Sequence, residues 1–197
     1  CIRDSLTTLW ADMSETETEI VRQFVERVLK LAEVPPGSGT DRLRIIARQR
    51  LTGARDPREK IVANLLLAVY HLSSGLPLET DKNLDAAEDL FDPQLMPYVY
   101  WGKSLVQRSR GNLHDAIQYA LFAIENVSAE GGFRDLRHLA LHTTVLAEEA
   151  SNRDRPDDAQ RAARLIESTL SEEKNVPTDE PWVADLLERV RSLRGKG

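Results

Sequence analysis

The chain has 197 residues, of which 41% are hydrophobic and 29% charged, which fits one folded domain with a hydrophobic core rather than a disordered segment. Its formal net charge of −6 argues against general nucleic-acid binding, because phosphate contacts need a basic surface. Cys1 is the only cysteine, which excludes an internal disulfide and a cysteine-rich metal site.

No run of the sequence approaches the roughly 18 apolar residues that span a bilayer, so we expect a soluble protein without a transmembrane segment. The compartment stays open, with the cytoplasm as the default. A mature bacterial lipoprotein also begins with cysteine, and a membrane anchor through Cys1 is therefore the alternative. We favour a fragment of a longer protein, because Cys1 leads almost at once into an expected helix instead of a flexible tether.

Apolar residues recur at intervals of three and four along most of the chain, which is typical of amphipathic helices. Ile20, Phe24, Val28 and Leu31, for example, share one helical face. The alternation that indicates β-strands is essentially missing. In chain order, the pattern predicts helices over 3–12, 15–33, 41–52, 57–74, 83–91, 94–110, 113–127, 133–152, 156–171 and 180–194.

Capping residues support these boundaries. Ser14 precedes an acidic first turn, and Asp56 precedes Pro57, a residue suited to the first turn of a helix. Gly75 and Gly111 are placed to end helices in the left-handed conformation. Because the loops are short, consecutive helices should pack as antiparallel hairpins.

One stretch of the sequence carries a repeat pattern, in which an aromatic and a small residue precede a glycine turn and small residues then follow at helical spacing. Its members are Tyr100, Ser104, Gly111, Asn112, Leu113, Ala116, Ala120, Ala123 and Ile124. This stretch resembles a tetratricopeptide (TPR) repeat. Small residues at these positions let two helices approach closely.

A second copy follows 43 residues later, longer than the usual spacing of about 34 residues. Ala147 then corresponds to Ser104, and Ala159 to Ala116. An earlier unit is weaker: Ala68 is its small residue, Gly75 ends its first helix, and Ala87 and Phe91 lie on its second helix. An insertion from Leu76 to Asn83 is expected between those two helices. Helices 15–33 and 41–52 could form a further hairpin without motif residues.

We therefore predict an all-α fold of antiparallel helical hairpins, stacked as a short TPR-like α-solenoid. An irregular α-helical bundle that uses alanine for packing is the alternative. Residues 1–197 would form a single all-helical domain. Its parts would be N-terminal helices over 1–56, TPR-like hairpins over 57–171 and a C-terminal capping helix over 172–197.

The resemblance implies that the first helix of each hairpin lines a concave groove for a partner. The residues expected to line it are Tyr98, Trp101, Leu105, Arg108, Thr144, Glu148 and Asn152. Trp101 and Arg108 are residue types that often dominate binding energy. The alternative interpretation is that Tyr98 and Trp101 pack in the core or between repeats.

Asp135, His138 and His142 share a helical face, but a complete metal site would need ligands from elsewhere, and we expect packed histidines with no metal. A basic stretch from Arg42 to Lys60 suits phosphate or an acidic peptide, although a solvated helix face is the favoured interpretation. An acidic stretch from Glu79 to Asp92 could support head-to-tail contacts between copies.

We find no nucleophile–base motif and no phosphate-binding loop, so we expect no enzyme activity, no catalytic residues and no cofactor. The favoured function is a non-catalytic protein–protein interaction scaffold or adaptor that binds a peptide or protein partner, or a second copy of itself, in a helical groove. The alternative is a TPR-type regulatory or sensor domain of a larger bacterial signalling or transcription protein.

Overall fold

The computed structural model describes residues 14–35, 38–127, 133–171 and 180–194. These residues form α-helices joined by loops, with no β-strand among them, so the all-α prediction is confirmed. The helices are α2 (Glu15–Leu31), α3 (Thr40–Gly53), α4 (Pro57–Ser73), α5 (Pro77–Glu88), α6 (Met96–Ser109), α7 (Leu113–Glu125), α8 (Phe133–Asn152), α9 (Pro156–Ser171) and α10 (Pro181–Arg194). Cys1 and the predicted helix over 3–12 lie outside the described residues.

Two predicted helix starts are confirmed in detail. The Ser14 hydroxyl accepts a hydrogen bond from the Glu17 backbone N–H, and the Glu17 carboxylate accepts one from the Ser14 N–H at 2.6 Å, which completes a capping box. The Asp56 carboxylate accepts from the Glu59 N–H at 2.8 Å, and Pro57 occupies the first turn of α4. Local sequence thus fixes where α2 and α4 begin.

The prediction for α5 was wrong at both ends. The helix begins at Pro77, directly after the Gly75 turn, so the expected insertion does not exist. The Thr80 hydroxyl donates to the Leu76 carbonyl at 2.9 Å, which lets a polar residue lie buried in the first turn. The helix ends at Glu88, and Phe91 lies beyond it with a left-handed φ of 41° and an exposed side chain.

The same turn joins the helices of three hairpins, α4–α5, α6–α7 and α8–α9. Each turn holds a residue with positive φ: Gly75 at 72°, Gly111 at 76° and Asp154 at 55°. In each, the next N–H bonds to the carbonyl five residues earlier, and the bonds are Leu76 to His71 at 2.9 Å, Asn112 to Gln107 at 3.0 Å and Arg155 to Ala150 at 2.9 Å. This is the hydrogen bond of a Schellman-type helix end. The hairpins are therefore built in one register.

Small side chains occupy the same place in each hairpin. Seven residues before the positive-φ residue lie Ala68, Ser104 and Ala147, all completely or almost completely buried. On the second helices, Ala116 and Ala159 are likewise buried, as expected for close helix approach. Their burial agrees with the predicted packing, and in the second hairpin the Ser104 hydroxyl on α6 reaches the Ala116 carbonyl on α7.

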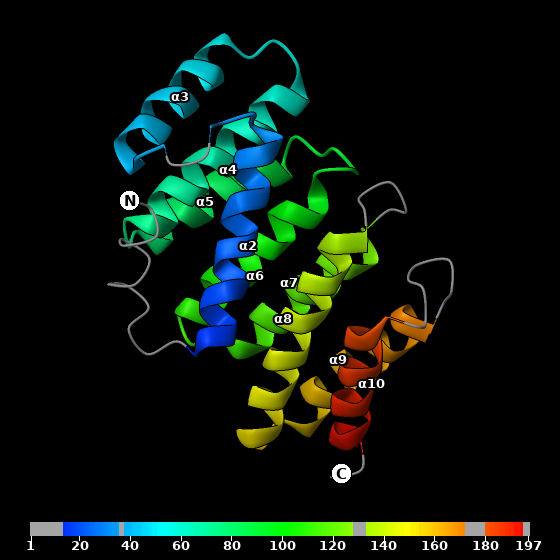
Figure 1. Ribbon diagram of the computed structural model, residues 1–197. Helices are drawn as coiled ribbons and strands as arrows, with labels where there is room; N and C mark the ends of the chain where they lie inside the picture. The colour runs from blue at the N-terminus through cyan, green and yellow to red at the C-terminus, as the bar shows by residue number, and fades with distance from the viewer. Residues whose placement is uncertain (1–13, 36–37, 128–132, 172–179, 195–197) are drawn as a thin grey trace.

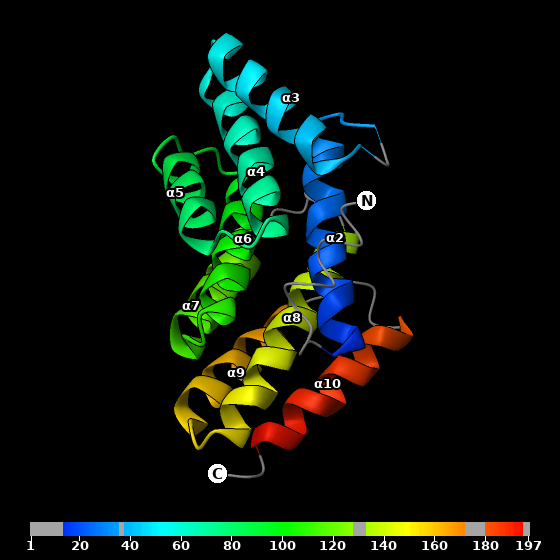
Figure 2. The same cartoon turned by 90° about the vertical axis from the view of Figure 1, so that its left-hand side faces the viewer.

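The hairpins follow one another in chain order, with α3 packed on α4 at one end and α10 packed on α8 and α9 at the other (Figures 1 and 2). The helix α2 does not pair with α3 as a hairpin, contrary to one expectation. It lies across the first helices of the three hairpins, α4, α6 and α8, instead (Figure 1). Within the described residues, no helix is both long and apolar enough to cross a membrane.

Candidate functional site

The face of α4, α6 and α8 that α2 covers is called the groove below, and it includes the helices on which the sequence predicts a partner. All of the predicted groove residues lie on α6 or α8. The groove is occupied by the chain's own helix α2. One face of α2 is buried in it, through Ile20, Val21, Phe24, Val25 and Val28. A partner can reach the centre of the groove only if α2 leaves it.

Trp101 lies at the centre of the groove and is completely buried. Its ring meets that of Phe24 edge to face, with ring centroids 5.5 Å apart and an interplanar angle of 64°. This is a favourable arrangement for an aromatic pair. Leu105, one turn along α6, is also buried, and Tyr98 is half-buried against the core. With α2 in place, Trp101 is a core residue, as the packing interpretation expects, and Leu105 is one as well.

The indole N–H of Trp101 lies buried without a hydrogen-bond acceptor among the described residues. The aromatic ring that meets Trp101 belongs to Phe24, which offers no conventional acceptor. A buried donor without an acceptor costs about 1–3 kcal/mol of stability. The apolar face of α2 therefore packs closely on the groove but provides no acceptor for the Trp101 N–H.

Arg108 connects three helices at one end of α2. Its guanidinium on α6 forms an ion pair with Glu17 of α2 and a second one with Glu149 of α8, at 3.1 Å. The Glu17 side chain is only 10% exposed and that of Arg108 19%, so solvent screens their attraction less than it would on an open surface. Arg108 therefore acts as the charged anchor of the groove.

Gly102 is a groove residue that the sequence reasoning missed. A Cβ atom at this position would lie 3.0 Å from Cζ of Phe24 and 2.9 Å from a methyl carbon of Leu84. The absence of a side chain thus lets α6 approach α2 and α5 at the same point. The available signal was a glycine inside a helical pattern, which usually has a packing reason.

The predicted groove residues on α8 have three different environments. Thr144 is buried, and its hydroxyl donates to the Ala140 carbonyl at 2.8 Å. Glu148 accepts two hydrogen bonds from Arg189 of α10, at 2.8 and 2.9 Å, and these bonds raise the pKa of the Arg189 guanidinium. Asn152 is exposed at the end of α8. The C-terminal helix α10 therefore engages the Glu148 side chain through Arg189.

His142 is completely buried and bonded within the protein. Its Nε2 lies 2.8 Å from the Ser104 hydroxyl, which itself donates to the Ala116 carbonyl at 2.7 Å. Because the hydroxyl has one hydrogen, Nε2 must be the donor to Ser104. Burial, assisted by the charge of Arg108, lowers the pKa of His142 to about 3, so the ring is neutral near pH 7.

The described residues contain no group of three or more histidine, cysteine, aspartate or glutamate side chains placed to hold a metal ion. The side chain of Asp135 lies outside the described residues. Because His142 Nε2 is engaged with Ser104, His142 forms a packing contact between α6 and α8.

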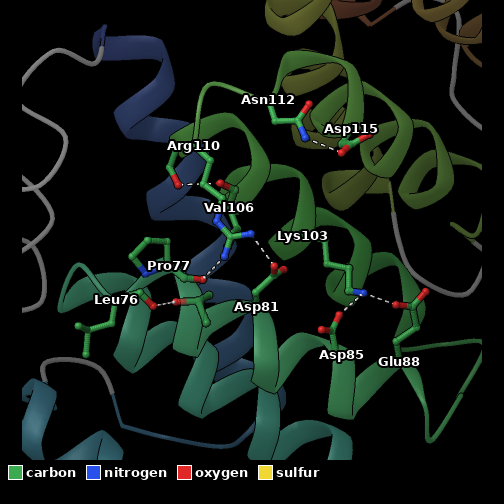
Figure 3. Close-up of polar contacts among 12 residues, drawn as sticks. Leu76, Pro77, Asp81, Asp85, Glu88, Lys103, Val106, Arg110, Asn112 and Asp115 are labelled. Carbon is green, nitrogen blue, oxygen red and sulfur yellow. Dashed lines mark hydrogen bonds and ion pairs between the residues drawn. The ribbon is translucent and has the colours of Figure 1, made fainter.

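Three of the six acidic residues between Glu79 and Asp92 form ion pairs with α6. Figure 3 shows the three ion pairs that join α5 to α6, two made by Lys103 and one by Arg110. Lys103 pairs with Asp85 at 2.6 Å and with Glu88. Arg110 pairs with Asp81 at 2.6 Å and donates to the Pro77 carbonyl at 3.1 Å. These acidic residues thus contribute to the junction of two hairpins.

The basic stretch lies at the opposite end of the array from α10. Arg42, Arg48 and Arg50 are exposed on α3, which agrees with a solvated helix face. Arg44 stacks over the Tyr70 ring at 5.8 Å, and Arg58 pairs with Asp92 at 3.0 Å. Part of this stretch therefore packs against the protein itself.

Comparison of the chain with protein-family models, with curated proteins and with solved structures finds no significant match. The resemblance to TPR proteins therefore rests on the sequence pattern alone.

Proposed function

We propose that this chain is a non-catalytic interaction scaffold or adaptor, similar in build to TPR proteins, that binds a protein or peptide partner in the groove. The observation that carries this proposal is α2 itself. An amphipathic helix is held there by an aromatic contact between Phe24 and Trp101 and by an ion pair between Glu17 and Arg108. These contacts are of the kind that fix a helix in a groove between proteins.

The architecture supports a binding role in a second way. The three hairpins share one turn geometry, so their first helices α4, α6 and α8 present successive side chains to the same surface. Repeated hairpins commonly use such a surface for recognition. The net charge of −6 favours a protein partner over a nucleic acid.

The test is site-specific crosslinking in the source cell. A photoreactive amino acid replaces Asn152, at the exposed end of the groove, or Ala86, an exposed residue of α5 that serves as the control. A partner that crosslinks from Asn152 and not from Ala86 would support the proposal. The recombinant partner should then bind the wild-type chain and lose affinity for Arg108→Gln. Crosslinks from Ala86 alone would place the interaction elsewhere and contradict the groove.

A regulatory or sensor domain of a larger signalling or transcription protein is the second candidate. It is supported by the location of α2, because release of this helix would give the chain a second state that a signal can select. The test is to fuse the chain to its neighbouring domain in the full-length protein and to measure that domain's activity. Activity that is the same in wild type and in Phe24→Ala would count against this candidate.

A further inference from the structure

We propose that α2 is an exchangeable occupant of the groove, and that the partner carries an amphipathic helix that takes the place of α2. This inference rests on the proposed function, because it concerns the same groove. It names the chemical class of the partner and makes α2 a built-in competitor. Four features of the structure carry the argument.

The first feature is that α2 encodes its own helix. Its start is fixed by the capping box of Ser14 and Glu17. Arg22 pairs with Glu19 at 2.5 Å and with Glu26 at 2.9 Å along its outer face. Its C-terminal end is closed by a bond from the Val34 N–H to the carbonyl five residues earlier, at 2.9 Å. A helix stabilised by local contacts can leave and return as a unit.

The second feature is the way α2 is attached. The helices of each hairpin are joined by a tight turn, whereas the chain continues from α2 into α3, which packs on α4 at the end of the array. The three hairpin turns and the ionic contacts between α5 and α6 involve no residue of α2. Departure of α2 would therefore leave the three hairpin turns and the ionic contacts between α5 and α6 in place.

The third feature is the incomplete polar fit at Trp101. While Phe24 meets its ring, the buried indole N–H has no acceptor in the part of the chain that the structure describes. A partner helix that brings an amide or hydroxyl oxygen to this N–H would satisfy a donor that α2 leaves unsatisfied. A competitor can thus gain an interaction at the centre of the groove that the internal helix does not make.

The fourth feature is the pattern that the groove selects. Counting from Glu17, which pairs with Arg108, the buried apolar residues of α2 follow at positions 3, 4, 7, 8 and 11, namely Ile20, Val21, Phe24, Val25 and Val28. We infer that the partner helix carries an acidic residue in its first turn, followed by apolar residues at this spacing. An acidic first turn also suits the N-terminus of a helix.

The internal helix competes strongly because it is tethered. A tethered segment acts at an effective concentration on the order of millimolar, so a free helix of equal affinity binds the wild-type chain only weakly. Weakening α2 should therefore raise the affinity for a helix added in solution. This relation distinguishes an exchangeable helix from a permanent part of the core.

The experiment uses the full chain and a fluorescent peptide of residues 14–34 as the probe, with binding followed by anisotropy. The Phe24→Ala chain should bind the peptide at least about 30-fold more tightly than wild type. Truncation of this buried phenylalanine weakens the binding of α2 to the groove by at least that factor, so α2 competes less with the peptide. Leu43→Ala, an equally buried truncation between α3 and α4, is the matched control and should behave as wild type. Adding Arg108→Gln to Phe24→Ala should reduce peptide binding again.

A folded Phe24→Ala chain that binds the peptide no better than wild type would overturn the inference. Hydrogen exchange gives a second measurement that does not need the peptide. In wild type, the amides of α2 should exchange faster than those of α4 to α9, and Phe24→Ala should widen the difference. Equal loss of protection in all helices would mean that α2 is an integral part of the core, and would also overturn the inference.

Two further outcomes separate this inference from the proposed function. If the peptide exchanges with α2 but no partner crosslinks at Asn152 in cells, α2 is exchangeable and the scaffold proposal fails. If a partner crosslinks there and binds wild type and Phe24→Ala equally, the scaffold stands and the inference fails. Dimerisation of Phe24→Ala in light scattering, in place of peptide binding, would make a second copy of the chain the occupant and overturn the assignment to a different partner.

Discussion

The Ser104 hydroxyl on α6 accepts a hydrogen bond from Nε2 of His142 on α8 at 2.8 Å, in a place closed to solvent. The same hydroxyl donates to the Ala116 carbonyl on α7. Three helices from two consecutive hairpins thus meet at one side chain. The second hairpin thus meets the third at a buried histidine whose lowered pKa keeps the ring neutral near pH 7.

The first prediction concerns pH. Burial lowers the pKa of His142 in the folded protein to about 3, against 6.5 in the unfolded chain. Between these values the unfolded chain binds a proton that the folded protein does not, so the free energy of unfolding falls as pH falls below about 6.5, by up to about 1.4 kcal/mol per pH unit. In chemical denaturation, the free energy of unfolding of wild type should be lower at pH 5 than at pH 7 by about 2 kcal/mol because of His142.

His142→Gln provides the comparison for that measurement, because glutamine keeps an N–H donor near Ser104 but has no proton to bind. Its free energy of unfolding should change less between pH 7 and pH 5 than that of wild type. Equal slopes for wild type and His142→Gln would contradict the assignment of a neutral buried ring.

The second prediction concerns the hairpin turns. Gly111 has a φ of 76°, and a Cβ there would meet no atom within 4 Å, so Gly111→Ala should destabilise through backbone strain alone, by about 1–2 kcal/mol. Asp154 has the equivalent φ of 55° in the next turn, and Asp154→Gly should stabilise the protein by up to about 1 kcal/mol. Thermal denaturation of both variants measures the effect.

Gly53→Ala is the matched control for the turns. Gly53 lies at the end of α3 outside the left-handed region, with open space around the position of a Cβ. Its replacement by alanine should be neutral or stabilising, by up to about 1 kcal/mol, because alanine favours a helix. If Gly111→Ala and Gly53→Ala shift the melting temperature alike, the three turns do not share the strained geometry.

The hairpins could be predicted from the sequence because local chemistry specifies them. Gly75 and Gly111 mark turns, and small residues such as Ser104 and Ala116 mark close approach of helices; each of these features is confirmed. The start of α5 was missed because its first buried residue is Thr80. A threonine in this position suggests a loop when only the sequence is known. The structure shows that its hydroxyl donates to the Leu76 carbonyl within the helix.

The location of α2 could not be predicted by the same means. The spacing of Ile20, Phe24 and Val28 shows that one face is buried, but periodicity does not say against which surface. Trp101 illustrates the same limit from the other side. A large aromatic residue on the first helix of a hairpin suits a binding surface and a core equally, and the difference lies in a helix more than 70 residues earlier in the chain.

The third prediction concerns the junction of α5 and α6. Burial by itself lowers the pKa of Lys103, but the hydrogen bonds to Asp85 and Glu88 raise it above its ordinary value, so the ammonium stays charged. The group also lies 5.3 Å from the centroid of the Tyr119 ring. Lys103→Met keeps the apolar stem and removes the charge, and should destabilise the protein by about 1–2 kcal/mol.

Lys82→Met controls for the general effect of removing a lysine, because Lys82 is an exposed residue of α5. Its effect on the free energy of unfolding should stay within about 0.5 kcal/mol. Urea denaturation of both variants gives the comparison. Equal effects of the two substitutions would mean that the contacts of Lys103 with α5 contribute nothing to the junction.

The fourth prediction separates the charged anchor of the groove from ordinary surface charge, by means of a double-mutant cycle. Glu17→Gln should keep the capping box, since glutamine can also accept the Ser14 N–H, but it removes the charge facing Arg108. Combined with Arg108→Met, it should give a coupling energy of about 1 kcal/mol or more, because the pair is shielded from water. The pair of Arg22 and Glu26, on the exposed face of α2, is the matched cycle and should couple by less than about 0.5 kcal/mol.

Hydrogen exchange of the α2 amides gives a second measurement. Exchange should be faster in Glu17→Gln than in wild type and little changed in Glu26→Gln. Additive effects of Glu17→Gln and Arg108→Met would mean that α2 is held by its apolar face alone, and that an acidic residue is not needed in a helix that replaces it.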